Sequence, residues 1–262
     1  MFDWGIRGAA IATVSAQVIA LLWQLKQFNN ANELLHFRRG IFRLKRKIVF
    51  DSLAIGMSPF LMNLAACLIV ILINQGLKKY GGDLAIGAFG IVNRLVFIVV
   101  MIVMGLNQGM QPIAGYNFGA KLYDRVNKVL KLTIIYATCV TTFGFLVGML
   151  APNLVVGIFT SDAELTELSA TGLRITVMFF PIIGFQMVTS NFFQSIGMAG
   201  KAIFLSLTRQ MLILLPCLLI LPHFFGVAGV WYSMPVSDLL ASLIALVMLV
   251  YQFRKFKTAA AH

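Results

Sequence analysis

A single carboxylate lies well inside one of the long apolar stretches of this sequence. It is Asp238, which stands in YSMPVSDLLAS, three residues after Pro235 and among small side chains. Inside a membrane an ionised side chain is costly, and such residues mark ion or proton sites, or else packed contacts between helices. We therefore expect Asp238 either to bind a proton or another cation, or to make a structural hydrogen bond between helices.

A second polar group, Asn93 beside Arg94, lies within another apolar stretch. It is about ten residues from the start of that stretch, or about 15 Å along a helix. At such a depth both side chains are expected to face protein or a water-filled cavity. We treat both as candidates for a substrate-binding cavity, with a purely structural role as the alternative.

Two more stretches combine a proline with polar side chains, GMSPFLMN from Gly56 and PIIGFQMVTSN from Pro181. A proline removes a backbone hydrogen bond and can kink a helix. Both stretches are therefore predicted to be cavity walls or hinges. They add three cavity candidates, which are Met57, Asn63 and Gln186.

The other reactive side chains indicate neither catalysis nor metal binding. No Ser–His or Cys–His pair can be placed at the same depth on the same side of a membrane, as a catalytic pair would require. No glycine-rich loop followed by Lys and Ser or Thr, which would bind ATP, is present. The histidines and cysteines show no metal-ligand spacing. They are His36, His223, His262, Cys67, Cys139 and Cys217. We expect no enzyme activity and no cofactor. Without an ATP-binding loop, any transport by this chain would have to draw its energy from a gradient of Na⁺ or H⁺.

The elements that position these residues are apolar helices. The chain has 262 residues, of which 60% are hydrophobic and 11% charged, and its mean hydropathy is +0.89. This is too little polar surface for a soluble domain, and a helix needs about 20 apolar residues to cross a bilayer. The sequence therefore predicts an all-α polytopic membrane protein with seven transmembrane helices. The stretches that qualify are 5–27, 53–75, 84–108, 126–150, 168–189, 202–221 and 227–253.

The net charge of +12 is divided unevenly between the two sides that alternating spans define. The richer side takes most of the 21 lysines and arginines: those in residues 26–47, those in residues 121–131, Lys201 and Arg209, and those in residues 254–257. The other side has Lys78 and Lys79 beside Asp162, Glu164 and Glu167. Positive charge marks the cytoplasmic side, so we expect a cytoplasmic C-terminus and no nucleic-acid partner.

The first and last spans resemble each other. GIRGAAIATVSAQVIALLWQL from Gly5 aligns without a gap with GVAGVWYSMPVSDLLASLIAL from Gly226. Internal repeats are common in transporters. We infer that residues 1–28 close one six-helix repeat, 29–51 form a basic cytoplasmic linker, 52–253 form the second repeat and 254–262 a cytoplasmic tail. The chain is then expected to be a C-terminal fragment that lacks about five helices.

A polar stretch, NQGMQPIAGYNFGAK from Asn107, ends one of the apolar runs. Its proline is predicted to end the helix, and its glycines to allow a tight and closely packed turn. The polar side chains are predicted to satisfy the backbone groups that the helix end leaves free. We interpret the stretch as a structural corner. Its residues are Gln108, Gln111, Pro112, Gly115, Tyr116, Asn117 and Gly119.

The same stretch, in GLNQGMQPIAGYNFGA, resembles the signature between the eighth and ninth helices of the multidrug and toxic compound extrusion (MATE) family. GAFGIVNRLVFIVVMIVMGLNQG is similar to that family's eighth helix, and NFFQSIGMAGKA to its loop after the tenth. The resemblance covers nearly the whole chain, as the sixth helix and the C-terminal lobe. It implies a twelve-helix protein of the plasma membrane, in bacteria the inner membrane, whose two lobes export cationic amphipathic drugs in exchange for Na⁺ or H⁺. Its partners would be the lipid bilayer and the N-terminal lobe of the same chain.

The chain departs from this family in its acidic residues. Some Na⁺-coupled members carry carboxylates in the seventh and tenth helices, but SLAIGMSPFLMNLAACLIVILINQ and LSATGLRITVMFFPIIGFQMVTS contain none. Other members place an aspartate on the first helix, which this sequence does not include. The resemblance therefore implies that the main coupling carboxylate is missing from this chain or is Asp238.

Two other functions remain open. A lipid-linked oligosaccharide flippase has a related two-lobed fold, but its cavity should hold several cationic side chains at depth, where the sequence clearly indicates Arg94 alone. A membrane interaction protein without transport activity is the other possibility. The fragment by itself is expected to behave in this way, because it lacks half of the cavity.

Overall fold

The computed structural model describes the backbone of residues 5–30, 36 and 45–260. Within these ranges every regular element is a helix, as the composition predicts. The chain divides into two units, Met1–Gly56 and Met57–His262, and each is described by itself. The predicted linker 29–51 falls largely outside the described ranges and stays a prediction.

The first unit contains α1 (Gly5–Phe28), whose bounds agree with the first predicted span within a residue. Its large apolar side chains are exposed, and Trp23 and Ile19 are 70% and 67% exposed. A helix that exposes apolar residues along its length is suited to contact with lipid rather than water.

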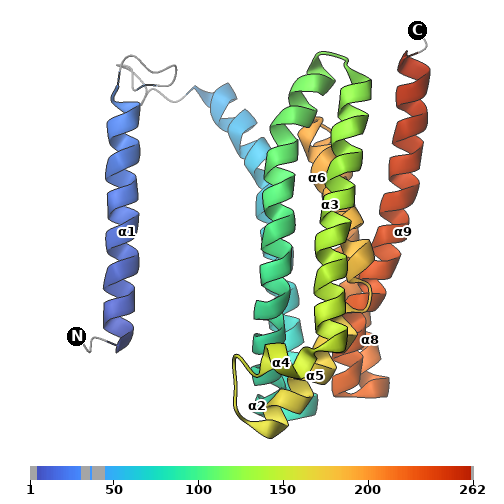
Figure 1. Ribbon diagram of the computed structural model, residues 1–262. Helices are drawn as coiled ribbons and strands as arrows, with labels where there is room; N and C mark the ends of the chain where they lie inside the picture. The colour runs from blue at the N-terminus through green and yellow to red at the C-terminus, as the bar shows by residue number, and fades with distance from the viewer. Residues whose placement is uncertain (1–4, 31–35, 37–44, 261–262) are drawn as a thin grey trace. The chain divides into compact units, whose positions relative to one another are not determined.

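The longest helix, α2 (Arg46–Gly119), is broken at Gly82, whose φ of 67° and ψ of −162° are not helical. Its apolar part, Phe60–Gly119, has 60 residues, which is about 90 Å of helix, roughly three times the hydrocarbon thickness of a bilayer. In the second unit α2 therefore crosses twice, and its two halves run in opposite directions (Figure 1), with the break at Gly82. Glycine is required there because a positive φ strains other residues. The predicted spans 53–75 and 84–108 are its two passes.

The remaining elements follow in chain order. They are α3 (Tyr123–Leu150), α4 (Pro152–Val156), α5 (Ala163–Val177), α6 (Phe180–Ser195), α7 (Ala199–Leu207), the π-helix η1 (Thr208–Leu214), α8 (Leu215–Phe225) and α9 (Val227–Ala260). The predicted span 168–189 is a bent pair, since α5 and α6 meet at 55°. Among the described residues four helices are long and apolar enough to cross a membrane, or five if this pair is one span. Because α2 is broken at Gly82 and is long enough for two passes, we count six passes from residue 60 onward. This agrees with the six helices predicted for the second repeat.

The second unit packs around two clusters of buried apolar side chains. One contains Phe89 and Trp231, with ring centroids 5.9 Å apart, and the other contains Phe192 and Phe193, 6.0 Å apart. A Cβ added at Gly172 would lie 2.7 Å from the Trp231 ring. The close contact between α5 and α9 therefore depends on the absence of a side chain at residue 172.

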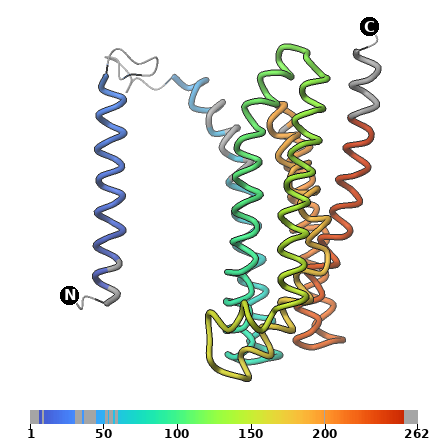
Figure 2. The backbone as a smooth tube through the Cα atoms, in the orientation of Figure 1, coloured from blue at the N-terminus to red at the C-terminus, as the bar shows by residue number. Residues whose placement is uncertain are grey.

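The ends of the second unit differ in charge. The α2–α3 connection and the C-terminal half of α9 lie at one end, and α4 and the α8–α9 connection lie at the other (Figure 2). The first end carries Lys121 and Arg125, whereas Asp162 caps α5 at the second by accepting from the Glu164 and Leu165 backbone N–H groups. The basic end is the one predicted to be cytoplasmic. α9 continues to Ala260, so the predicted tail 254–262 begins as an extension of this helix.

The corner at the end of α2 differs from the prediction in two respects. Nothing lies within 4 Å of a Cβ added at Gly119, so the close packing predicted there is absent, and the positive φ of the turn is at Lys121 rather than at a glycine. Pro112 does not end the helix, which continues for about two more turns before the chain turns at residues 120–122, where Lys121 has a φ of 60°. A proline inside a helix removes one donor from the ladder but does not always stop it. The close packing predicted for Gly115 is present, because a Cβ there would lie 3.0 Å from the Ser195 carbonyl oxygen.

Candidate functional site

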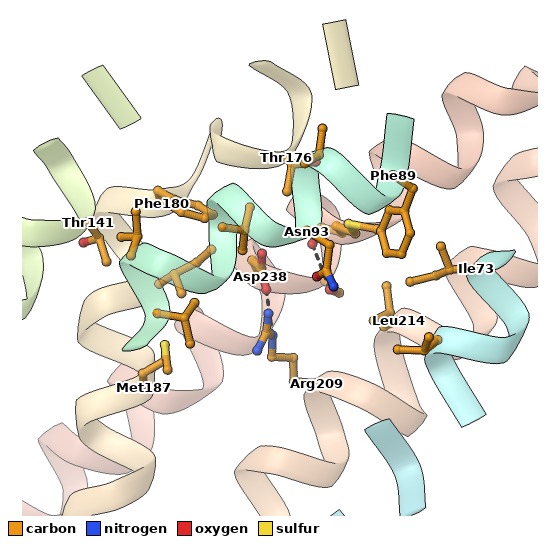
Figure 3. A pocket seen from close by; sticks show the side chains of 18 residues that line it. Ile73, Phe89, Asn93, Thr141, Thr176, Phe180, Met187, Arg209, Leu214 and Asp238 are labelled. Atoms are coloured by element: carbon orange, nitrogen blue, oxygen red, sulfur yellow. Dashed lines mark hydrogen bonds and ion pairs between the residues drawn. The ribbon is translucent and has the colours of Figure 1, made fainter. Parts of the chain in front are cut away.

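The carboxylate within the last membrane pass has a charged partner. Arg209 Nε lies 2.7 Å from Asp238 Oδ1, and the two side chains are 33% and 5% exposed (Figure 3). A buried carboxylate is stable as an ion when a hydrogen-bonded cation compensates it. The contact between helices that was one of two predictions for Asp238 is therefore present, and its partner is a cation.

Arg209 lies inside a membrane pass, and the count of charges, which grouped it with Lys201 on the basic side, did not identify it as a partner of Asp238. It belongs to η1, where the Leu215 N–H bonds to the Gln210 carbonyl five residues earlier. Pro216 follows in the first turn of α8, and a proline ring collides with the carbonyl four residues before it in a regular helix. A π-helical turn absorbs such a misfit. The signal was present in the sequence, because Arg209 falls within the predicted span 202–221.

The ion pair borders a cavity of about 220 Å³, which we call the carboxylate cavity (Figure 3). The hydroxyl groups of Thr141, Thr176 and Ser237, which line it, donate to carbonyls of their own helices over 2.8 to 3.0 Å. Each of these oxygens keeps its capacity to accept. Among the described residues no three His, Cys, Asp or Glu side chains cluster. A cation held here would therefore rest on Asp238 and on neutral oxygens, which are the ligands that hard cations prefer.

Arg209 also lines a second cavity of about 380 Å³, which we call the amide cavity. Asn191 Nδ2 donates to the Met187 carbonyl at 2.9 Å, and the Ser190 and Ser206 hydroxyl oxygens are 3.1 Å apart. The polar side chains that line it are Asn63, Gln186, Ser190, Asn191, Gln194, Ser206, Arg209 and Gln210. Carboxamides donate and accept, so this cavity can bond to polar groups of either kind.

The residues singled out as cavity candidates do not all lie together. Met57 and Arg94 are exposed and line neither cavity. Consecutive residues on a helix point about 100° apart, so Arg94 diverges from its neighbour. The other four divide between the two cavities: Asn93 and Asp238 line the carboxylate cavity, and Asn63 and Gln186 line the amide cavity.

The corner residues make contacts with helix ends. Asn117 is 8% exposed, its Nδ2 donates at 2.8 Å to the carbonyl one turn before it, and its own carbonyl accepts from the Leu122 N–H at 2.9 Å. Gln111 Nε2 lies 3.5 Å from Asn191 Oδ1, which is a long contact, and Tyr116 is 77% exposed. Because the backbone turn receives most of these bonds, we continue to interpret the stretch as a structural corner.

Comparison with known proteins finds one family. Residues 54–220 match the family model described as MatE. The chain is 27% identical over 257 residues to Multidrug export protein MepA of Staphylococcus aureus (strain MSSA476), and 24% identical over 253 residues to that of Staphylococcus saprophyticus. Each match covers 97% of this chain and 55% of the relative. The chain thus spans about half the length of the curated relatives it matches.

Solved structures share the fold. A structure of the MATE multidrug transporter DinF-BH is 35% identical, with a TM-score of 0.82, and the match covers 97% of this chain and 57% of that one. An outward-facing conformation of a multidrug resistance MATE family transporter is 21% identical, with a TM-score of 0.84 over 97% of this chain and 58% of that one. The second likeness shows the fold alone.

Proposed function

Since this chain belongs to the multidrug and toxic compound extrusion (MATE) family, we propose that it forms part of a transporter that exports several drugs across the plasma membrane in exchange for Na⁺ or H⁺. The chain spans about half of its curated relatives. We therefore assign the activity to a full-length protein in which residues 1–28 complete an N-terminal lobe and the second unit is the C-terminal lobe. One lobe provides half of a central cavity, so the chain alone is expected to be inactive.

The observation that carries ion coupling is the buried carboxylate. Asp238 is 4% exposed and borders a cavity with several neutral oxygens. A site whose charge changes when an ion binds can bias one conformation over another, and a gradient of that ion can then drive the cycle. We assign Asp238 as the residue that binds Na⁺ or H⁺, with Asn93 and Ser237 as neutral oxygen ligands for a metal cation.

Drug binding is assigned to the amide cavity. Asn63 and Gln186 offer hydrogen bonds, and Met62, Met104 and Met187 offer flexible apolar surface. A mixture of this kind accommodates amphipathic drugs of different shapes, because methionine side chains repack at low cost. Asymmetry of charge supports a cytoplasmic position for the basic end of the second unit, and with it for the C-terminus.

The experiment that tests this function uses the full-length protein in bacterial cells that lack their main drug exporters. Expression should lower the accumulation of ethidium, and either a protonophore or removal of Na⁺ should restore it. Unchanged accumulation, with the protein present in the membrane, would contradict multidrug export. Export that survives both treatments would contradict coupling to either cation.

A further inference from the structure

Of the residues that line the two cavities, Arg209 is the charged one that borders both. We propose that Arg209 is a tethered cation, which occupies Asp238 while the coupling ion is absent and moves into the amide cavity when that ion binds. This inference rests on the proposed function, because it adds a competitor to the ion site assigned there.

The charges of the site favour such an exchange. Arg209 and Asp238 together are neutral, and they are the charged side chains among those lining the carboxylate cavity. Adding a second cation would leave a buried positive charge without compensation, and withdrawing Arg209 without a replacement would leave a buried carboxylate alone. Both states are costly. The replacement of one cation by another keeps the carboxylate cavity neutral. The displaced guanidinium, whose side chain is already 33% exposed, carries its charge to the carboxamide oxygens of the amide cavity. Entry of the ion and withdrawal of the arginine are therefore linked.

Charged groups on neighbouring helices do not supply the replacement. The charged residues that flank the cavity-lining segments in sequence do not line the carboxylate cavity. Arg94 and His223 are exposed, Glu167 and Arg174 line a separate hollow, and Lys201 donates to Gln252. The cation that takes the place of the guanidinium therefore has to come from solution.

The two partners differ in their freedom to move. The side chain of Arg209 is 33% exposed and that of Asp238 is 5% exposed. Within the described residues, the bond from Nε to Oδ1 is the one hydrogen bond of the guanidinium, although a guanidinium has five N–H donors. A paired, bidentate contact would hold it more firmly. Arg209 can thus leave by breaking one contact, while Asp238 stays in place.

The amide cavity provides acceptors for the guanidinium after it leaves. Gln210 lines this cavity, and within the described part of the chain no donor reaches its buried Oε1. A buried acceptor without a donor is unfavourable, and an arginine N–H group is a suitable donor. Gln186 and Gln194 offer further carboxamide oxygens in the same cavity.

The backbone on both sides of the pair is irregular, which allows the movement. Arg209 stands in η1, a π-helix of seven residues, and Asp238 follows Pro235 inside α9. π-Helical turns are rare in proteins, but those that occur are often found at functional sites. A change between π and α geometry redirects side chains by up to about 100° without separating the helices. η1 can therefore re-aim Arg209 while the bundle stays packed.

The test measures the ion dependence of export by the purified full-length protein in liposomes. The half-saturating concentration of the driving ion, Na⁺ or H⁺, is determined for the parent and for Arg209→Gln. When Arg209 occupies Asp238, the ion can bind only to the fraction of molecules in which the carboxylate is free, and its apparent affinity falls in proportion. Removal of this tethered competitor should therefore lower the half-saturating ion concentration by roughly tenfold or more. Arg209→Lys, which keeps the charge without the fork of donors, should fall between the two.

The matched control is Arg174→Gln, which removes an arginine from a separate hollow and should leave the half-saturating concentration unchanged. If Arg209→Gln fails to fold because the Asp238 carboxylate is left unpaired, the half-saturating concentration of Arg209→Lys is compared with that of the parent instead. A purely structural arginine would lower the yield or the maximal rate of export and leave the ion dependence as in the parent.

The outcomes separate this inference from the function on which it rests. A half-saturating concentration that stays within about twofold of the parent value in the arginine variants would overturn the inference. Export by the parent that no cation gradient drives would overturn the proposed function, and the inference with it. Both the inference and the proposed function are supported if an ion gradient drives export by the parent and the half-saturating concentration is lowest in Arg209→Gln, intermediate in Arg209→Lys and highest in the parent.

Discussion

Lys201 and Gln252 are joined by a hydrogen bond of 2.6 Å from Nζ to Oε1, which links α7 to α9. The Lys201 Nζ also lies 5.3 Å from the centre of the Phe193 ring, and Gln252 is 1% exposed. A cation held between an amide oxygen and an aromatic face is well compensated. The contact fixes the end of α9 against the helix that leads into η1.

The first prediction concerns this link. Lys201→Met should lower the free energy of unfolding of the full-length protein by about 1–3 kcal/mol, because Gln252 Oε1 is left buried without this donor. The measurement is thermal or denaturant unfolding in detergent. Lys128→Met, at an exposed residue of α3, is the control and should change stability little. Equal stability of the two variants would contradict the role given to the link.

The second prediction concerns the contact between α5 and α9. Gly172→Ala should destabilise the protein by about 1–3 kcal/mol, since the added methyl group meets the Trp231 ring and overpacks the cluster. Gly90→Ala is the matched control, because nothing lies within 4 Å of a Cβ at that helical position. It should leave the protein unchanged or more stable by up to about 1 kcal/mol. Destabilisation of equal size in both variants would show that helix propensity, not contact, governs the effect.

The third prediction tests the buried carboxylate. Asp238→Asn should lower ion-driven export by roughly tenfold or more, because an amide cannot change charge when a cation arrives. Binding of ethidium, measured by fluorescence in detergent, should persist. Asp162→Asn changes the exposed cap of α5 and should leave the ion dependence unchanged. Export by Asp238→Asn that remains driven by the ion at the parent rate would exclude this carboxylate from coupling.

The fourth prediction concerns the corner of α2. Asn117→Ala should lower stability by about 1 kcal/mol, because it removes the hydrogen bond from Nδ2. Export of different drugs should fall by the same factor, since a corner acts on folding or on the conformational change. The measurement is export of three chemically different drugs by the same preparation, with Tyr116→Phe at an exposed position as the control. A change of drug preference without loss of stability would point to direct contact with substrate.

The fifth prediction concerns the amide cavity. Gln186→Leu should raise the half-saturating concentration of hydrogen-bonding drugs by about threefold to tenfold, which is the value of one hydrogen bond. Drugs that lack polar groups should be exported as before. Gln108→Leu, at an exposed residue of α2, serves as the control. An equal effect on all drugs would indicate that Gln186 supports packing.

The membrane passes could be predicted from the sequence because apolar length is a local property. Residues 5–28 form the first helix almost within the predicted limits, and the corner at Gly115 is as closely packed as its glycine indicates. Asp238 could also be found, since a carboxylate inside an apolar run is visible in one dimension.

The partner of Asp238 could not be found in the same way. Counting charges by side grouped Arg209 with Lys201, whereas its contact with Asp238 depends on a π-helical turn before Pro216 and on the packing of η1 against α9. Pro112 misled for a similar reason. A proline ends a helix or is tolerated within it according to the groups that pack around it. The local sequence around Pro112 does not contain that information.

Gly82 joins the two passes of α2 without a loop. Asn63 of the first pass lines the amide cavity, and Asn93 of the second lines the carboxylate cavity. A hinge of one residue leaves little slack, so a shift of either pass along the membrane normal displaces the other. Residues of both passes line both cavities, so one hairpin contributes to each of them. Movement at the cavity proposed for the ion is therefore expected to reach the cavity proposed for the drug through this hairpin.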